Sequence, residues 1–439
     1  MQNRYSHIVL GLGATGLSVV RFLMQKGITP LVMDSRRQPP GAKTLADEFP
    51  DIELVRGGFD CRYIVQAQQL IVSPGIALDT PEVRAALDMG IEVIGDIELF
   101  ARELASRKPC VIGITGSNGK STVTTLVKDM LADAGHKVVM GGNIGTPALD
   151  LLSQDADFYV LELSSFQLET TSSLNCIAAA CLNLCEDHMD RYSDINSYRD
   201  AKVRLYQQTR FLMYNREDEL TKPDEPMNQN SFGLDVPESD GWGIVDGQIF
   251  HGTSEIMALD NIGIIGSHNH ANVMAAMALV DACGVDKNSM VNVAKAFKGL
   301  SHRCELVAEK NGVYYINDSK ATNVGATVAA IEGFDSHLGD IYLIAGGDGK
   351  GADFAPLEGV LSQVTELITL GADGDKIAKL KSGTVQVKNM KQAVEHAAAE
   401  AMSGDIVILS PACASLDMYS NFMARGDDFT QCVEQIADA

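Results

Sequence analysis

The chain has 439 residues, of which 46% are hydrophobic and 21% charged, so two or three domains can each bury a core. Its formal net charge of −23 argues against binding to nucleic acid or to an anionic membrane surface, because both attract basic proteins. No stretch approaches the roughly 20 apolar residues of a membrane span, and the polar start at residues 1–7 is unlike a secretory signal, so we expect a cytoplasmic protein.

The first part of the chain predicts a small parallel α/β sheet, from a helix at 17–26 and strands at residues 7–13, 30–34, 69–72 and 91–94. The run Gly11-Leu12-Gly13-Ala14-Thr15-Gly16 stands between the first strand and the helix, and Asp34 ends the second strand. A dinucleotide site uses the same glycines and acid, so an NAD-dependent oxidoreductase is one hypothesis. The glycines themselves indicate only a close phosphate, and Ser35 and Arg36 could bind the diphosphate of any nucleotide.

The most informative run is Gly113-Ile114-Thr115-Gly116-Ser117-Asn118-Gly119-Lys120-Ser121-Thr122. It predicts a buried strand, a glycine turn and a helix that begins at Ser121 and ends at Gly135. Backbone N–H groups and the helix dipole favour phosphate there, Lys120 can neutralise it, and a hydroxyl can hold Mg²⁺. The strict phosphate-loop pattern has glycine where this chain has Ile114, but the order of elements still predicts a nucleoside triphosphate site.

The middle of the chain continues as an α/β unit. After a helix at 96–107 and the phosphate loop, its pattern predicts buried strands at residues 137–140, 158–163 and 176–184. Short antiparallel strands are predicted at 228–265, and a helix at 271–283. Cys176, Cys181, Cys185 and His188 lie close in sequence and could be taken for a zinc site. Because most of 176–185 is an apolar strand pattern, free buried cysteines are the better interpretation.

Three side chains near the phosphate loop could carry chemistry. Glu162 lies at the end of a strand, where an acid beside a phosphate loop can hold Mg²⁺ directly or through water, or can simply face solvent. His188 follows the next predicted strand, and there a ligand role competes with a structural one. Lys202 lies on a predicted helix, and its spacing indicates only an exposed lysine.

After residue 300 the alternation restarts, with a last helix at 427–437 and strands at residues 313–316, 341–345, 367–370, 384–387 and 406–409. Polar loops at 318–323, 346–350 and 410–415 follow three of these strands. The carboxyl ends of parallel strands share one sheet edge, so the loops outline a crevice for a small acidic ligand. Arg303 could reach from this part to ATP. The whole pattern predicts three consecutive α/β domains, at 1–95, 96–300 and 301–439.

Taken together, these motifs resemble the Mur ligases of peptidoglycan synthesis, over essentially the full length and in the same domain order. The resemblance rests on residues 115–122, 141–145, 161–167, 186–190, 267–272, 302–303, 317–323, 346–350 and 410–415. The unusual glycine spacing of the phosphate loop is the family's own form. The resemblance implies an N-terminal Rossmann-like domain for a UDP-linked substrate, a central P-loop ATPase-like domain with a parallel sheet and a small antiparallel part, and a C-terminal Rossmann-like domain for the incoming amino acid.

The resemblance also implies a reaction, in which ATP phosphorylates the carboxylate of UDP-N-acetylmuramoyl-L-alanine. The amine of D-glutamate then attacks the acyl phosphate, which yields an amide, ADP and phosphate. Two Mg²⁺ and Lys120 would offset charge as the phosphoryl group approaches another anion. By similarity, the catalytic and metal-binding residues are Lys120, Asn143, Ser121, Glu162, His188 and Lys202, the last as a carbamylated lysine.

The binding residues follow from the same resemblance. ATP would contact the phosphate loop and four further side chains, namely Gly116, Ser117, Asn118, Gly119, Lys120, Ser121, Thr122, Asn272, Arg303, Asp318 and Lys320. D-glutamate would contact Thr322, Lys350, Ser415 and Phe422. The uridine diphosphate would face Ala14, Thr15, Ser35, Arg36 and Gly75, where the family often has leucine in place of Ala14 and threonine in place of Ser35.

Three alternatives remain open at this point. A sister ligase that adds another amino acid, or adds glutamate to a folate, would share the central domain, but the loops at 11–16, 34–36 and 410–415 favour the D-glutamate enzyme. An oxidoreductase leaves the phosphate loop unexplained, and the three converging loops argue against a non-catalytic ATP-gated protein. We expect a monomer that acts on small molecules, without nucleic acid or membrane partners.

Overall fold

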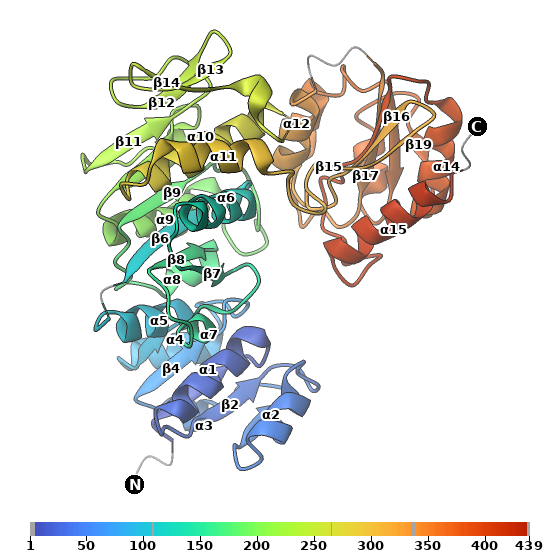
Figure 1. Ribbon diagram of the computed structural model, residues 1–439. Helices are drawn as coiled ribbons and strands as arrows, with labels where there is room; N and C mark the ends of the chain where they lie inside the picture. Colours follow the sequence, from blue (N-terminus) through green and yellow to red (C-terminus); the bar gives the residue numbers. More distant parts are fainter. Residues whose placement is uncertain (1–4, 108, 265, 335–338, 437–439) are drawn as a thin grey trace.

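The computed structural model describes residues 5–107, 109–264, 266–334 and 339–436. Three α/β units follow one another along the chain, and each has its own sheet. Figure 1 shows the N-terminal unit in blue below the green central unit, with the orange and red C-terminal unit beside the upper part of the central one. The three consecutive α/β units predicted from the sequence are confirmed, while the boundaries at 95/96 and 300/301 stay predictions.

The N-terminal sheet is parallel, in the order β3-β2-β1-β4-β5. Its strands are β1 (His7–Leu10), β2 (Leu31–Asp34), β3 (Leu54–Arg56), β4 (Gln69–Val72) and β5 (Glu92–Ile94). The helices are α1 (Ala14–Gln25), α2 (Ala42–Glu48), α3 (Cys61–Ile64) and α4 (Pro81–Asp88). The strand predicted to reach residue 13 ends at Leu10, because Gly11 turns the backbone into the left-handed region (φ +89°) and α1 begins at Ala14.

The central sheet has the order β14-β13-β12-β11-β10-β9-β6-β8-β7. Its first strands are β6 (Cys110–Thr115), β7 (Val138–Gly142), β8 (Phe158–Glu162), β9 (Ala178–Cys181) and β10 (Leu212–Asn215). They are followed by β11 (Gln229–Phe232), β12 (Trp242–Val245), β13 (Gln248–His251) and β14 (Ser254–Ala258). The antiparallel prediction for 228–265 is right for β12 to β14 and wrong for β11, which pairs in parallel with both neighbours; residue 265 lies outside the described residues.

Helices cover both faces of the central sheet. They are α6 (Lys120–Asp133), α7 (Ala148–Leu151), α8 (Ser165–Glu169), α9 (Ile195–Val203), α10 (Ser267–Asp281) and α11 (Lys287–Ala296), with 3-10 turns η1 (Arg204–Gln208), η2 (Glu219–Thr221) and η3 (Leu259–Asn261). The strand predicted at 176–184 is only Ala178–Cys181 long, because the chain then bends onto the phosphate loop: Leu182 N donates to Thr115 O, and Ser117 N to Asn183 O.

The C-terminal sheet runs β15-β16-β20-β17-β18-β19, with only β15 (Glu305–Lys310) antiparallel among its described strands. The others are β16 (Val313–Asn317), β17 (Ile341–Gly346), β18 (Glu366–Leu370), β19 (Val385–Gln386) and β20 (Ile406–Leu409). Its helices are α12 (Val324–Glu332), η4 (Ala355–Gly359), α13 (Gly374–Ala378), α14 (Met390–Glu400) and α15 (Phe422–Glu434). The last helix starts before the predicted residue 427, because Asn421 caps it by accepting from Ala424 N; residue 437 lies outside the described residues.

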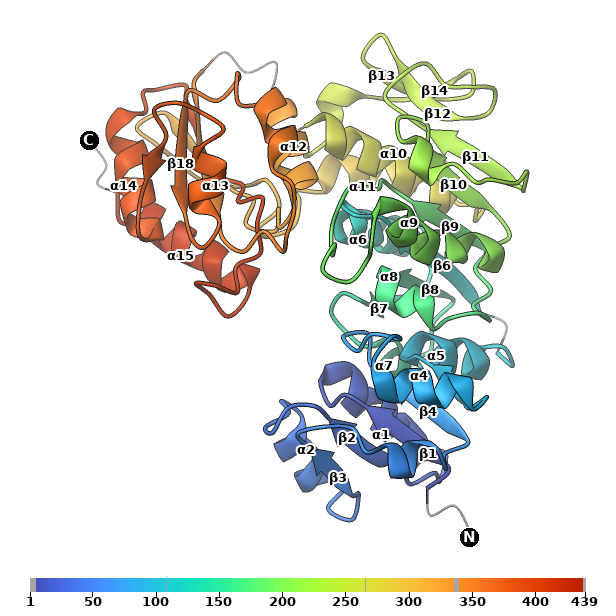
Figure 2. The same ribbon diagram turned by 180° about the vertical axis from the view of Figure 1, so that it is seen from behind.

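The N-terminal and central units share a hydrophobic core. Helix α5 (Asp96–Leu104) packs on α1 of the N-terminal unit and on α7 of the central unit, and its Phe100 is buried against Tyr159 of β8, with the ring centroids 5.5 Å apart. The Ser18 hydroxyl of α1 also donates to Asp150 of α7 at 2.7 Å. The C-terminal unit contacts the central one differently: Figures 1 and 2 show α12 beside α10 from both sides. Among the described residues, no helix has the length and apolarity needed to cross a bilayer.

Replacement of Phe100 tests this shared core. Phe100→Ala should lower the free energy of unfolding by about 3–5 kcal/mol, because it leaves a cavity where α5 meets β8. Urea unfolding followed by circular dichroism measures the change. Met89→Ala is the control, since Met89 is 60% exposed and its loss should change the unfolding free energy little. Equal effects of the two changes would contradict a core that joins the units through α5.

Candidate active site

The phosphate loop lies between β6 and α6, as the sequence predicts for residues 113–122. Gly116 (φ +140°) and Gly119 (φ +80°) turn the chain, and Gly119 immediately precedes α6. A Cβ on Gly119 would overlap the end of the Asn272 side chain of α10, so another residue there would displace Asn272 and would also have to adopt a positive φ. The Lys120 Nζ folds back over the loop and donates to the carbonyl oxygens of Gly116 (2.8 Å) and Ser117 (2.7 Å). This is a cradle of backbone N–H groups and one ammonium at a helix N-terminus.

Cations gather around this loop. Burial lowers the pKa of Lys120, and it lowers the pKa of Lys202 to about 7 and that of Lys320 to about 8. Burial is the largest cause of each shift, and neighbouring positive charges act in the same direction, Lys120 on Lys202 and Arg303 on Lys120 and Lys320. Glu162 opposes the shifts of Lys120 and Lys320. An anion placed among these groups would relieve their repulsion. The site is therefore electropositive inside a protein of net charge −23.

One chain of hydrogen bonds crosses the loop. The Ser121 hydroxyl donates to Glu162 Oε2 at 2.6 Å and accepts from Arg303 Nη2 at 2.6 Å. Asn143 Nδ2 donates to the other oxygen, Glu162 Oε1, at 2.7 Å. Ser121 and Glu162 are both buried. Four residues predicted from the sequence to act together thus lie in contact, although they come from α6, β8, the loop after β7 and the C-terminal unit.

A cleft of about 230 Å³ surrounds these groups, and we refer to it as the transfer cleft. Its lining includes all five predicted catalytic side chains and two of the residues expected to contact D-glutamate, namely Lys120, Asn143, Glu162, His188, Lys202, Thr322 and Lys350. The other two D-glutamate residues, Ser415 and Phe422, are not part of this lining, although the Lys320 Nζ lies 4.9 Å from the Phe422 ring centroid. Their assignment to D-glutamate stays a prediction.

The interpretation of Lys202 as an exposed lysine is wrong. The side chain is buried, not exposed as spacing alone indicates; its Nζ donates to Gly116 O at 2.9 Å and lies 4.6 Å from the Tyr198 ring centroid. Sequence spacing missed this because α9 turns its Lys202 face toward the phosphate loop, a tertiary contact. Burial also lowers the pKa of His188, so its ring is neutral near pH 7 and has a lone pair to offer a metal.

A second cleft, of about 480 Å³, lies at the carboxyl end of the N-terminal sheet and is called the N-terminal cleft. Its lining includes the five residues expected to face uridine diphosphate, Ala14, Thr15, Ser35, Arg36 and Gly75. The Asp34 carboxylate accepts from Leu12 N (2.7 Å) and from Arg36 Nε (2.8 Å) and Nη2 (2.6 Å), which lowers the Asp34 pKa against the effect of burial. Those oxygens are thus used within the protein, which does not favour the ribose-binding acid of the oxidoreductase hypothesis.

Asn143 lines both the N-terminal cleft and the transfer cleft. A ligand whose nucleotide end occupies the first can therefore present its other end at Asn143 to the second. This continuity needs the loop after β7, which Gly142 (φ +99°) directs: Asn143 N donates to Glu162 O at 2.8 Å.

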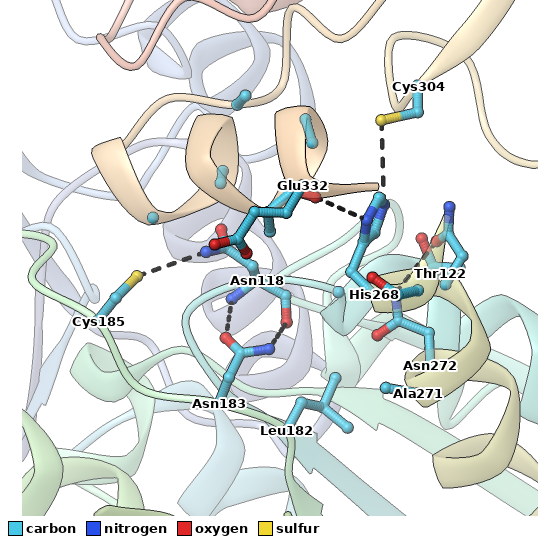
Figure 3. Close-up of a pocket in the computed structure, with 18 of the residues that line it drawn as sticks. Asn118, Thr122, Leu182, Asn183, Cys185, His268, Ala271, Asn272, Cys304 and Glu332 are labelled. Carbon is cyan, nitrogen blue, oxygen red and sulfur yellow. Dashed lines mark hydrogen bonds between the residues drawn. The ribbon is translucent and has the colours of Figure 1, made fainter. Parts of the chain in front are cut away.

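A third pocket, of about 320 Å³, opens on the other side of the phosphate loop (Figure 3). It is lined by Asn118, Gly119, Thr122, Asn272, Arg303, Asp318 and Lys320, all predicted ATP contacts. Burial raises the pKa of Asp318 to about 7, and Ser410 Oγ donates to it at 2.8 Å. Figure 3 shows Asn183 facing Asn118, with Asn118 N donating to Asn183 Oδ1 at 2.8 Å. Asn183 follows β9 and was not singled out from the sequence, although its place after a strand beside the loop is a usable signal.

Asp187 is a second residue that the sequence analysis missed. Burial alone would raise its pKa, but Lys350 and then His188 outweigh burial, and the pKa falls to about 2. Lys350 Nζ lies 2.6 Å from Asp187, and Asn323 Nδ2 donates to it at 3.3 Å, so the C-terminal unit contacts the central one here. The adjacent His188 drew attention to this position, but the partner from the C-terminal unit could not be read from the sequence.

The cysteine-rich stretch forms no zinc site. Cys176, Cys181 and Cys185 are free thiols, and burial raises the pKa of each, to about 12 for Cys176 and about 11 for the others. No group of three or more His, Cys, Asp or Glu positioned for a metal occurs in the part of the chain that the structure describes.

The fold and these clefts define a class of protein, an enzyme that binds a nucleoside triphosphate between α/β units. Residues 5–95 match the family model for the N-terminal domain of MurD-like Mur ligases, 114–280 that for the Mur ligase middle domain, and 302–413 that for the glutamate ligase domain of Mur ligases. The chain therefore belongs to the Mur ligase family. The family uses ATP and Mg²⁺.

Curated relatives match the whole chain. A UDP-N-acetylmuramoylalanine–D-glutamate ligase of Shewanella oneidensis is 72% identical over 436 residues, 99% of both chains, and one of Vibrio parahaemolyticus is 46% identical over 446 residues, again 99% of both. Among solved structures, a pseudomurein peptide ligase type C from Methanothermus fervidus (TM-score 0.62, 17% identity, 98% and 100% coverage) and a UDP-N-acetylmuramate–alanine ligase from Thermotoga maritima (0.59, 17%, 98% and 99%) share the fold.

The residues around the phosphate loop fit both ATP and Mg²⁺. The loop amides, Lys120 and Arg303 suit a triphosphate, whose negative charge would offset the repulsion among the cations around the loop. For Mg²⁺, the Ser121 hydroxyl and the Glu162 carboxylate are oxygen donors held in contact at 2.6 Å. Two protein oxygens with phosphate oxygens are a typical Mg²⁺ environment.

Two glycines with similar backbone angles test the cradle. Gly119→Ala should weaken binding of an ATP analogue roughly tenfold or more, because its Cβ overlaps Asn272 and displaces the loop. The control is Gly135→Ala, at φ +88° and with open space around the added Cβ, which should lower stability and leave nucleotide affinity unchanged. Fluorescence titration with a labelled ATP analogue measures both. Equal affinities for the two variants would contradict this placement of the nucleotide.

Proposed function

We propose that this chain joins D-glutamate to UDP-N-acetylmuramoyl-L-alanine, with conversion of ATP to ADP and phosphate, in cytoplasmic peptidoglycan precursor synthesis. The observation that carries the proposal is Asn143, which lines both the N-terminal cleft and the transfer cleft. A nucleotide-linked acid in the first has its far end beside the phosphate loop. The ligases of Shewanella and Vibrio named above support the choice of substrates.

We assign the residues roles in this reaction, most of them according to the cleft that they line. Ala14, Thr15, Ser35, Arg36 and Gly75 hold the uridine diphosphate, and Asn143 orients the reacting carboxylate. Lys120 offsets the negative charge that builds up when the terminal phosphoryl group of ATP moves to that carboxylate. The resulting acyl phosphate has a good leaving group, which the free carboxylate lacks. Thr322, Lys350, Ser415 and Phe422 present D-glutamate, whose amine forms the amide and expels phosphate.

Magnesium would be held by Ser121, Glu162, His188 and Lys202, and we propose two ions, which supply charge neutralisation between the phosphates and the carboxylate. For this role Lys202 has to become a carbamate. Burial lowers its pKa to about 7, so above that pH most of its amine is neutral and able to attack CO₂, with release of a proton. The product carries a negative charge and two oxygen donors, where the unmodified side chain carries a positive charge.

The sister ligases remain the alternative from the same family. They would share the phosphate loop, and would differ in what the N-terminal cleft and the C-terminal loops accept. We further propose that the enzyme acts as a cytoplasmic monomer, without nucleic acid or membrane partners, in keeping with its acidic charge.

Steady-state phosphate release tests the reaction. With ATP and Mg²⁺ present, sustained release should require UDP-N-acetylmuramoyl-L-alanine and D-glutamate together, and neither alone should suffice. Lys120→Ala should reduce the rate at least roughly 100-fold with an unchanged melting temperature. Release in wild-type enzyme that is indifferent to D-glutamate would reject the proposal, and faster turnover with another amino acid would favour a sister ligase.

Carbamylation of Lys202 has its own test. Lys202→Ala should be nearly inactive, and added formate or acetate should restore part of the rate, because a small carboxylate can occupy the space of the carbamate. Lys120→Ala is the control, since the same anions should not restore it. Full activity of Lys202→Ala, or equal rescue of both variants, would contradict the carbamate.

A further inference from the structure

Arg191 lies between the N-terminal cleft and the transfer cleft. Its guanidinium pairs with Glu169 at 2.6 Å, and the two side chains are only 15% and 16% exposed. The same Nη2 donates to the carbonyl oxygen of Ile76 at 3.5 Å, and Ile76 is part of the lining of the N-terminal cleft. Arg191 therefore joins the central unit to the loop that borders the nucleotide handle of the substrate.

Arg191 reaches the transfer cleft through Phe166, which lines it. Its guanidinium carbon lies 4.6 Å from the centroid of the Phe166 ring, and that ring lies 4.8 Å from the ring of His188. Arg191 N also donates to His188 O at 2.8 Å. His188 has a left-handed backbone (φ +59°), which a non-glycine residue keeps only where its surroundings hold it. Phe166 and His188 both line the transfer cleft.

Glu169 holds in place the side chains that pack on Phe166. Its second oxygen accepts from the Tyr192 hydroxyl at 2.7 Å, and the Tyr192 ring stacks on Phe166 at 5.9 Å. One carboxylate thus holds both the arginine and the tyrosine that contact Phe166. A change at Glu169 should loosen the same contacts as a change at Arg191.

We propose that Arg191, held by Glu169, is a positioning residue that couples occupation of the N-terminal cleft to the placement of His188 in the transfer cleft. When the loop containing Ile76 closes on the nucleotide-linked acid, Arg191 transmits its position to Phe166 and His188. This inference rests on the proposed function, because it concerns the same acid substrate. It assigns a role to an ion pair that contacts neither the phosphate loop nor the loops expected to bind D-glutamate.

A purely structural ion pair is the competing interpretation, and the chain offers a matched control. Arg199 is 13% exposed and pairs with Asp224 at 2.8 Å in the same central unit, and it also donates to two backbone carbonyls. Neither arginine lines a cleft, but Arg191 contacts Phe166 and Ile76, which do. The hydrogen-bond partners of the Arg199 side chain, Leu220, Lys222 and Asp224, line neither cleft. Arg199→Met therefore also removes an ion pair of a largely buried arginine, although Asp224 is 74% exposed and Glu169 only 16%, and only Arg191→Met interrupts the proposed coupling.

The experiment compares Arg191→Met, Arg191→Lys, Glu169→Gln and Arg199→Met in the full-length enzyme. Kinetic constants are measured for each substrate separately, well below the melting temperature. For Arg191→Met we expect KM for UDP-N-acetylmuramoyl-L-alanine to rise roughly tenfold and kcat to fall, with KM for ATP within about twofold of wild type. Glu169→Gln should follow the same pattern, Arg191→Lys should lie between it and wild type, and Arg199→Met should match wild type.

The outcomes separate the two proposals. If wild type is active and both Arg191→Met and Glu169→Gln keep wild-type constants, the coupling is wrong and the ion pair is structural. If KM rises equally for every substrate, the change is general and the coupling is also wrong. If Arg191→Met does not fold, Glu169→Gln decides in its place, since it keeps the size of the side chain. An inactive wild type would instead reject the proposed function.

Discussion

The rest of the site depends on the hydroxyl of Ser121. It donates to Glu162 and accepts from Arg303, while Glu162 also accepts from Asn143, so three hydrogen bonds of 2.6 to 2.7 Å run from the C-terminal unit to the rim of the N-terminal cleft. Strand register makes this possible. Glu162 of β8 stands opposite Ile114 of β6 and Gly142 of β7, which brings the phosphate loop and Asn143 to the same end of the sheet.

Charge explains how a protein of net charge −23 can bind polyanions. Lys120, Lys202 and Lys320 lie together around one loop with Arg303, so positive charge is concentrated there although the whole chain carries −23. Loss of solvent lowers their pKa values most and their mutual repulsion adds to this, and the negative charge of a bound triphosphate or of a carbamate at Lys202 would offset that repulsion. The site is thus arranged to be completed by anions, which is the requirement of an enzyme that moves a phosphoryl group between two of them.

The sequence predicts the α/β units and the phosphate loop because both depend on local pattern. Apolar runs form buried strands, and glycines before Lys120, between a strand and a helix, indicate a phosphate-binding turn. Glu162 and His188 are also singled out as candidates near the phosphate loop by their places at or after the ends of strands, and both line the transfer cleft. The sequence does not predict that Lys202 is buried, that Asp187 pairs with Lys350, or that Arg191 meets the carbonyl of Ile76, because each contact joins elements far apart in the chain. Parallel pairing of β11 was missed for another reason, since short strands close together in the chain usually pair as antiparallel hairpins.

The most direct test of phosphoryl transfer through this junction follows an oxygen atom. UDP-N-acetylmuramoyl-L-alanine labelled with ¹⁸O in both carboxylate oxygens is converted in unlabelled water with ATP and D-glutamate, and the mass of the released phosphate is measured. If the phosphoryl group passes to the carboxylate beside Asn143, each phosphate carries one ¹⁸O, since amide formation breaks the bond between that oxygen and carbon. Phosphate without label would mean that water cleaves ATP, and would contradict the account.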